Sequence, residues 1–189
     1  MKSVSNLKIK TKEGFSVKNL KRFPSMEWGD EGGLQADIFY KNNFVGTVFN
    51  AGDGGCANMD FTEYGRKNID TLKVAALSFL KRCDENWNKY DFLRDKLPKA
   101  IDDDDWESVV NLIEERYDDV KAIKKSFKKG YKSVVILSGD VSKTYLQYKV
   151  GGITLDEVED YIKRNNLDKK YPHHSGLFLA SMPEQLEVM

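Results

Sequence analysis

The chain has 189 residues, with 30 Lys and Arg side chains against 30 Asp and Glu, and 40% hydrophobic residues. This length and composition suit one folded domain or two small ones, and they exclude disordered, collagen-like and coiled-coil proteins. No apolar run reaches the roughly 20 residues of a membrane-spanning helix, and the N-terminus lacks the apolar core of a signal peptide. We therefore expect a cytoplasmic protein that makes no membrane contact.

The first third of the chain predicts β-strands, because apolar and polar residues alternate there. Residues 34–50 form the clearest hairpin, with alternating segments on both sides of Lys41-Asn42-Asn43. Asparagine tolerates the left-handed backbone that such a turn requires. A glycine-rich loop at 50–55 follows the hairpin, and the apolar residues Met59 and Phe61 then fit a further strand.

Two helices are expected in the middle of the chain. Apolar residues recur every three or four positions from about 68 to 86, which predicts a helix with one broad apolar face. A second helix is expected after Ile101, where four aspartates supply an N-cap and first-turn negative charge. Lysines occupy its last turns, and Gly130 ends it.

The last third adds a hairpin and a helix. Residues 133–150 flank a Gly-Asp turn, and Thr154 with Glu157 forms a capping box that opens a helix ending near 165–166. Residues 176–179 fit one more strand. Hairpins with helices inserted between them predict an α+β fold, a mainly antiparallel sheet with about three packed helices. We expect one domain over 1–189, or two lobes with a hinge near 96–106.

The glycine-rich loop has two interpretations. Glycine lets backbone N–H groups approach an anion closely, so the loop and a later lysine cluster could hold a nucleotide or another anion. The residues after the loop do not have the pattern of a helix start, and the loop lacks the Lys-Ser/Thr pair of a Walker motif. Both features favour a simple connection between two strands. The candidates for ligand binding are Asn50, Gly52, Asp53, Gly54, Gly55, Lys124 and Lys128.

Residues 101–119 carry nine acidic side chains and one basic one. These carboxylates are either the solvated side of a capped helix or an acidic surface that attracts a basic partner protein. Trp28, in a loop rich in glycine, is either a plug over the sheet or an anchor for a partner. The candidates for partner binding are Trp28, Asp102, Asp103, Asp104, Asp105 and Glu107. A divalent-metal-dependent nuclease or hydrolase is a third class, although four consecutive aspartates cannot all face one ion.

The remaining polar groups indicate no metal site and no cofactor. His173 and His174 are adjacent, so in an extended segment they point to opposite faces, and Cys56 and Cys83 are not spaced as a metal-binding pair. Six lysines between 121 and 132 could contact nucleic-acid phosphates, or they could be neutralised by acids one turn earlier.

Residues 33–55 combine a hairpin, a V-G-x-V strand and an N-x-G-x-G-G loop. This stretch resembles small, mostly uncharacterised proteins of phages and other mobile elements. The resemblance implies a mobile-element origin and supplies no catalytic residue. Because the sequence also lacks a convergent catalytic set, we expect a non-enzymatic binding protein that inhibits a host protein or defence system through a protein–protein interface. A phage-encoded chain would act in the cytoplasm of the host cell.

Overall fold

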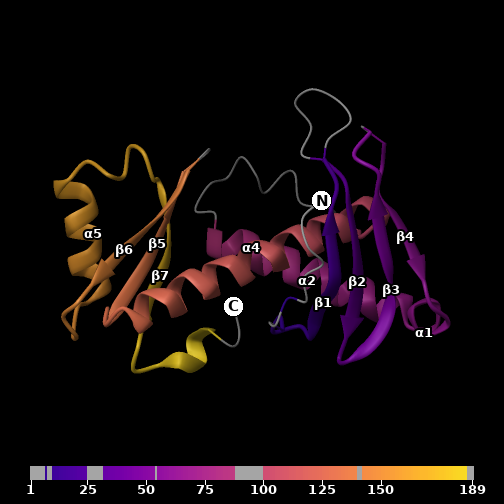
Figure 1. Ribbon diagram of the computed structural model, residues 1–189, viewed down its shortest axis with the longest axis horizontal. Helices are drawn as coiled ribbons and strands as arrows, with labels where there is room; N and C mark the ends of the chain where they lie inside the picture. The colour runs from indigo at the N-terminus through magenta and orange to yellow at the C-terminus, as the bar shows by residue number, and fades with distance from the viewer. Residues whose placement is uncertain are drawn as a thin grey trace. The chain divides into compact units, whose positions relative to one another are not determined.

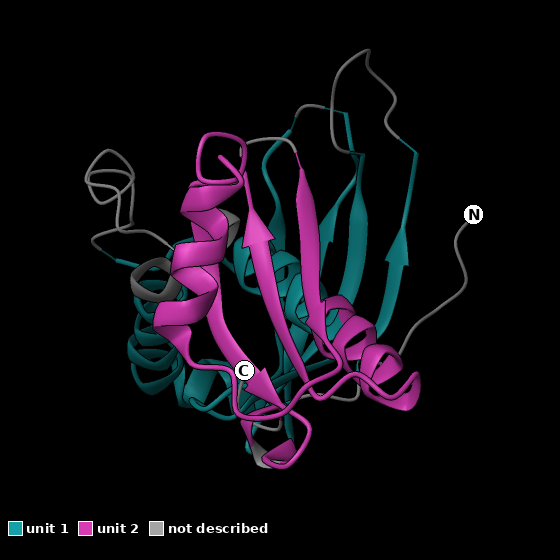
Figure 2. Ribbon diagram, turned by 90° about the vertical axis from the view of Figure 1, so that its left-hand side faces the viewer, with its two compact units in different colours: residues 1–83, 95–117, 188 teal, residues 84–94, 118–187, 189 magenta. Residues whose placement is uncertain are grey.

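The computed structural model describes residues 7, 10–24, 32–53, 55–87, 100–139 and 142–186 (Figure 1). The chain forms two compact units, coloured separately in Figure 2. Unit 1 comprises residues 1–83, 95–117 and 188, and unit 2 comprises residues 84–94, 118–187 and 189. One boundary falls after Cys83, and another falls inside helix α4 (Asp103–Lys128), after Tyr117. The hinge expected near 96–106 stays a prediction, since its first part lies outside the described residues.

Unit 1 contains a four-stranded antiparallel sheet whose strands follow chain order. The strands are β1 (Phe15–Arg22), β2 (Leu34–Tyr40), β3 (Asn43–Asn50) and β4 (Asn58–Phe61). The first expected hairpin is confirmed as β2 and β3. Its turn residues Lys41 and Asn42 both have positive φ angles, 48° and 71°, as a tight two-residue hairpin turn requires.

Helices α1 (Glu63–Lys67) and α2 (Ile69–Trp87) follow the sheet, and the first part of α4 completes unit 1. The apolar periodicity predicted α2 correctly, whereas α1 was not anticipated. One face of the sheet shares a core with α2 and α4. Trp106 of α4 is fully buried there, and its ring meets Phe15 and Phe61 edge to face at centroid distances of 6.0 and 5.7 Å.

Unit 2 contains a three-stranded antiparallel sheet in the order β6-β5-β7. Its strands are β5 (Ser133–Ser138), β6 (Lys143–Tyr148) and β7 (His173–Leu179), which confirms the second hairpin and the late strand. The central strand β5 is buried on both faces. One face packs against the second part of α4 and the other against α5 (Leu155–Arg164), so this unit has a helix on each side of its sheet (Figure 1).

The expected capping box at the start of α5 is confirmed. The hydroxyl oxygen of Thr154 accepts the Glu157 N–H at 3.3 Å, and the Glu157 carboxylate accepts the Thr154 N–H at 2.7 Å. A 3-10 helix, η1 (Pro183–Leu186), follows β7. The antiparallel sheets and packed helices of both units confirm the α+β fold. Among the helices that the structure describes, none combines the length and apolar character needed to span a bilayer.

Candidate binding surfaces

Asp102 and Asp105 form the N-terminal cap of α4. The Asp102 N–H donates to the Asp105 carboxylate at 2.9 Å, and the Asp105 N–H donates to the Asp102 carboxylate at 3.3 Å. Two otherwise unpaired backbone donors of the helix are thereby satisfied. Asp103 and Asp104 belong to the first turn, but their side chains lie outside the described part of the structure. These contacts favour a structural role for Asp102 and Asp105, and their contact with a partner stays a prediction.

Glu107 and Asn50, which the sequence assigned to two different sites, lie together in unit 1. The Asn50 amide donates to the Glu107 carboxylate at 2.7 Å, and both groups are partly buried. The Asn50 side-chain oxygen also accepts the Gly52 N–H at 2.8 Å. Asn50 therefore connects the end of β3 to α4 and shapes the glycine-rich loop at the same time.

Close backbone packing explains the first glycine of that loop. Gly52 has φ 74°, and a Cβ added to it would lie 2.3 Å from the Gly33 backbone nitrogen. Further along, the Asp53 carboxylate accepts the Gly55 N–H at 3.1 Å, and both residues are exposed. Gly54 lies outside the described residues. The packing of Gly52 favours a tight connection between strands, and ligand binding by this loop stays a prediction.

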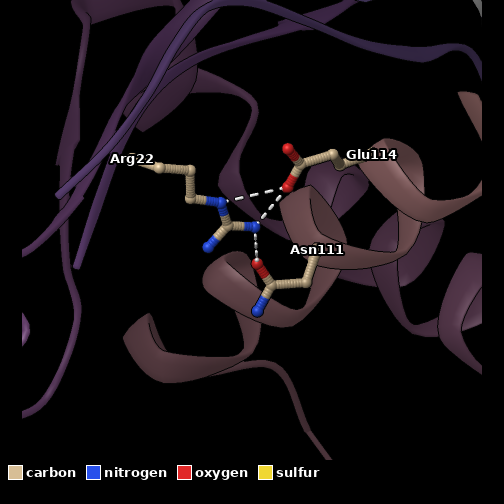
Figure 3. Close-up of polar contacts among 3 residues, drawn as sticks. All are labelled: Arg22, Asn111 and Glu114. Carbon is tan, nitrogen blue, oxygen red and sulfur yellow. Dashed lines mark hydrogen bonds and ion pairs between the residues drawn. The ribbon is translucent and has the colours of Figure 1, made fainter. Parts of the chain in front are cut away.

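Another carboxylate of the acidic segment holds β1 on α4. Both Nε and Nη2 of Arg22 donate to the same Glu114 oxygen, with Nε at 3.0 Å, and Nη2 also donates to the Asn111 amide oxygen at 2.6 Å (Figure 3). The Arg22 and Glu114 side chains are only 24% and 30% exposed. Because the contact is charged and mostly buried, this cluster fixes the end of β1 against the helix.

In unit 2, Asp119 of α4 is buried and accepts bonds from Lys143 and from the Tyr145 hydroxyl, each at 2.9 Å. Lys124 and Lys128 lie one turn apart on the same helix and are exposed. These two lysines belong to unit 2, whereas the glycine-rich loop belongs to unit 1. Trp28, the remaining partner-binding candidate, lies outside the described residues.

The outward face of the unit 1 sheet carries aromatic residues that the sequence did not single out. Phe39 and Phe44 lie opposite each other on β2 and β3, with ring centroids 5.3 Å apart. Phe23 and Phe49 form a second pair at 6.1 Å. Phe44 is 40% exposed and Phe49 is 44% exposed. We call these four phenylalanines and their neighbours Lys18, Asp37 and Thr47 the outer-sheet surface.

A β-bulge explains why this surface was missed. Phe39 pairs with Phe44 but Ile38 pairs with Gly46, so Val45 is an extra residue in β3. Strict alternation would place Phe44 on the same face as the buried Val48, because the two are four positions apart. The extra residue at Val45 shifts the alternation by one position, so Phe44 lies on the outward face instead. Phe39 could have revealed this surface from the sequence. It lies between the buried Ile38 and Tyr40 of β2, so strand alternation places its side chain on the outward face.

Polar contacts fix the centre of the outer-sheet surface. The Asp37 carboxylate accepts from the Thr47 hydroxyl at 2.8 Å and from the Asn19 amide at 2.7 Å. In the strand register, the Asp37–Thr47 pair lies between the Phe39–Phe44 pair and Phe49, which faces Gln35. The Lys18 ammonium lies 4.2 Å from the centroid of the Phe39 ring, a cation–π distance.

The described residues show no grouping typical of a metal site, and Cys83 is not an activated thiol. Nowhere in the described ranges do three or more His, Cys, Asp or Glu residues come close enough together to hold a metal ion. Burial raises the pKa of the Cys83 thiol, and the nearby Arg116 offsets this only in part, so the group is a protonated thiol rather than a nucleophile at neutral pH. His174 Nε2 lies 3.6 Å from a Glu159 carboxylate oxygen in unit 2.

Comparison of the chain with protein-family models, with curated proteins and with solved structures found no match.

Proposed function

We propose that this chain is a non-enzymatic binding protein that recognises a partner protein through the outer-sheet surface. The observation that carries the proposal is the exposure of Phe44 and Phe49 on a sheet face opposite the one that packs against α2 and α4. Large aromatic side chains contribute much of the energy of protein interfaces, because they bury a large apolar area with few rotatable bonds.

The outer-sheet surface is also preorganised for binding. Its phenylalanines belong to hydrogen-bonded antiparallel strands or lie directly after β1, where the Phe23 N–H donates to the Gly33 carbonyl at 2.9 Å. Asp37 is held by two hydrogen bonds between the aromatic pairs. A surface that is already ordered loses little conformational entropy on binding, so more of the contact energy appears as affinity.

The charge next to the phenylalanines favours a partner with an acidic group beside an apolar centre. Lys18 is exposed, its ammonium lies over the Phe39 ring, and it forms no ion pair with a residue that the structure describes. Charged groups at the rim of an interface mainly raise the association rate and the specificity.

The resemblance of residues 33–55 to phage and mobile-element proteins supports a host protein as the partner. Inhibition of a host factor or of a defence system is therefore part of the proposal. The contacts of Asn50, Gly52 and Asp102 support the fold of unit 1, so they lend less weight to a nucleotide-binding loop or an acidic docking face.

The test compares capture of proteins from a host-cell lysate by tagged variants of the full chain. Phe44→Ser/Phe49→Ser removes the two exposed rings, and Val74→Ser is the matched control, because Val74 is 70% exposed on α2 of the same unit. We expect one protein to be retained by the wild type and by Val74→Ser, and to be lost with the double variant. Circular dichroism must show that both variants are folded. Equal retention by the double variant would refute the proposed surface, and turnover of a nucleotide or nucleic acid by the pure chain would refute a non-enzymatic role.

A further inference from the structure

A second surface, in unit 2, is strongly basic. Residues 121–132 contain six lysines and no acidic residue, and all six lysines are exposed. Lys121 has a polar or charged contact. The other five form no ion pair with any residue that the structure describes. These five are Lys124, Lys125, Lys128, Lys129 and Lys132.

The periodicity of α4 keeps three of these lysines off its buried side. Val120 and Ile123 are buried against β5, with Phe127 packed beside them. Lys125 and Lys128 point away from that side and Lys124 lies at its edge, and all three are exposed. The neutralisation by acids one turn earlier, which the sequence left open, does not occur for these three lysines among the described residues.

The basic surface extends past the end of the helix. The Lys132 N–H donates to the Tyr148 carbonyl at 2.7 Å, which brings the end of β6 alongside the start of β5. Lys149 follows directly, and its ammonium lies 5.9 Å from the Tyr131 ring centroid. We call Lys124, Lys125, Lys128, Lys129, Lys132 and Lys149 the lysine surface.

We propose that the lysine surface binds the phosphodiester backbone of a nucleic acid without sequence preference. Like charges four residues apart on a helix repel each other, and Lys124 and Lys128 are such a pair, with Lys125 and Lys129 spaced the same way across the end of the helix. A chain of phosphates removes this repulsion, because several lysines each contact a separate phosphate and release condensed counterions. This site is separate from the outer-sheet surface and does not depend on it.

The surroundings of the lysines distinguish a nucleic acid from other polyanions. A helix that binds a membrane surface inserts its apolar side into the lipid, but the apolar side of α4 is packed in the core of unit 2. A protein interface of ordinary affinity has large apolar anchors at its centre, whereas the exposed positions within residues 121–132 are six lysines and Gly130. A phosphate backbone requires only the positive charge that this surface offers.

The experiment measures binding of the full chain to fluorescently labelled 20-nucleotide single-stranded DNA and 20-base-pair duplex DNA by anisotropy, over a series of salt concentrations. The logarithm of the affinity should fall linearly with the logarithm of the salt concentration, with a slope of about −0.9 for each duplex phosphate contacted and about −0.7 for each single-strand phosphate. The two probes show which form of the backbone is preferred.

Lys124→Gln/Lys125→Gln/Lys128→Gln should weaken binding at least tenfold and make the salt slope shallower by about two to three. The matched control is Lys163→Gln/Lys169→Gln/Lys170→Gln, which removes the same charge from exposed positions elsewhere in unit 2 and should change little. Glutamine has a helix propensity close to that of lysine, which preserves α4 and the Lys163 position of α5, and Lys169 and Lys170 are exposed turn positions. Circular dichroism of both variants must match that of the wild type. Three results would overturn the proposal: no DNA binding at low salt, equal loss in both variants, or binding to phosphatidylserine vesicles without binding to DNA.

Discussion

Breaking the contact between Arg22 and Glu114 tests whether the acidic side of α4 supports the fold. Arg22 donates two hydrogen bonds to Glu114 and one to Asn111, and both charged side chains are roughly three-quarters buried. Exposed ion pairs contribute up to about 1 kcal/mol, whereas breaking a buried pair costs about 3–5 kcal/mol. For this intermediate burial we expect Arg22→Ala and Glu114→Ala each to lower the free energy of unfolding by about 2 kcal/mol.

A double-mutant cycle isolates the pair itself. The Arg22→Ala/Glu114→Ala variant should lose about 1–2 kcal/mol less than the sum of the single variants, because the second substitution removes a partner that is already missing. Urea unfolding followed by circular dichroism and by tryptophan fluorescence supplies the free energies, and Trp106 lies in the core of unit 1. Arg66→Ala on α1 is the control, since Arg66 is exposed and should change stability by less than about 0.5 kcal/mol. If the loss of unfolding free energy in the double variant equals the sum of the two single-variant losses to within about 0.3 kcal/mol, the structural role of the pair is refuted.

Three further predictions concern unit 1. Asp102→Ala should lower the free energy of urea unfolding by about 0.5–2 kcal/mol because it removes a cap acceptor, while Asp102→Asn should retain most of the stability; an equal loss in both would contradict the cap. Gly52→Ala should cost more than about 1 kcal/mol in the same assay, since its φ is 74° and the added Cβ would meet the Gly33 backbone, whereas Gly151→Ala, with open space around it, should cost far less. Burial alone would raise the pKa of Glu13, but the hydrogen bonds and charge of Arg82, together with a backbone hydrogen bond and Thr11, outweigh it and hold that pKa below its usual range. Ionised Glu13 therefore stabilises the fold at pH values above its unfolded-state pKa of about 4.3. This contribution is lost as the pH falls through the lower pKa of the folded state. The free energy of urea unfolding should therefore fall less between pH 6 and pH 3 in Glu13→Gln than in the wild type.

The elements that local rules determine were predictable from the sequence. The turn was predicted at Lys41-Asn42-Asn43 because asparagine tolerates positive φ and the strands on both sides alternate; the positive φ falls on Lys41 and Asn42, and Asn43 already belongs to β3. Helix α2 and the capping box of α5 follow from three- and four-residue periodicity and from the Thr154–Glu157 spacing. Each of these signals is contained within one element, so it does not depend on the rest of the chain.

The candidate surfaces depend on contacts between distant segments, which no local pattern encodes. Asn50 and Glu107 are 57 positions apart, and only the fold reveals that they bind each other. The sequence shows the charge of Glu114 but not that Arg22 is its partner. The bulge at Val45 inverts the alternation by which an outward Phe44 would have been recognised. The lysines of α4 are visible in the sequence, but whether acids one turn earlier neutralise them was left open, because that depends on which side chains pair in the folded chain.

The most direct test of the outer-sheet surface is site-specific photo-cross-linking inside host cells. A benzophenone amino acid is placed at Phe44 or Phe49 in the full chain, and at Val74 on α2 as the control position. Because the two phenylalanines belong to one surface, positions 44 and 49 should cross-link to the same host protein, and position 74 should not. Cross-links to that protein at position 74 alone, or different products at positions 44 and 49, would contradict partner binding by this face of the sheet.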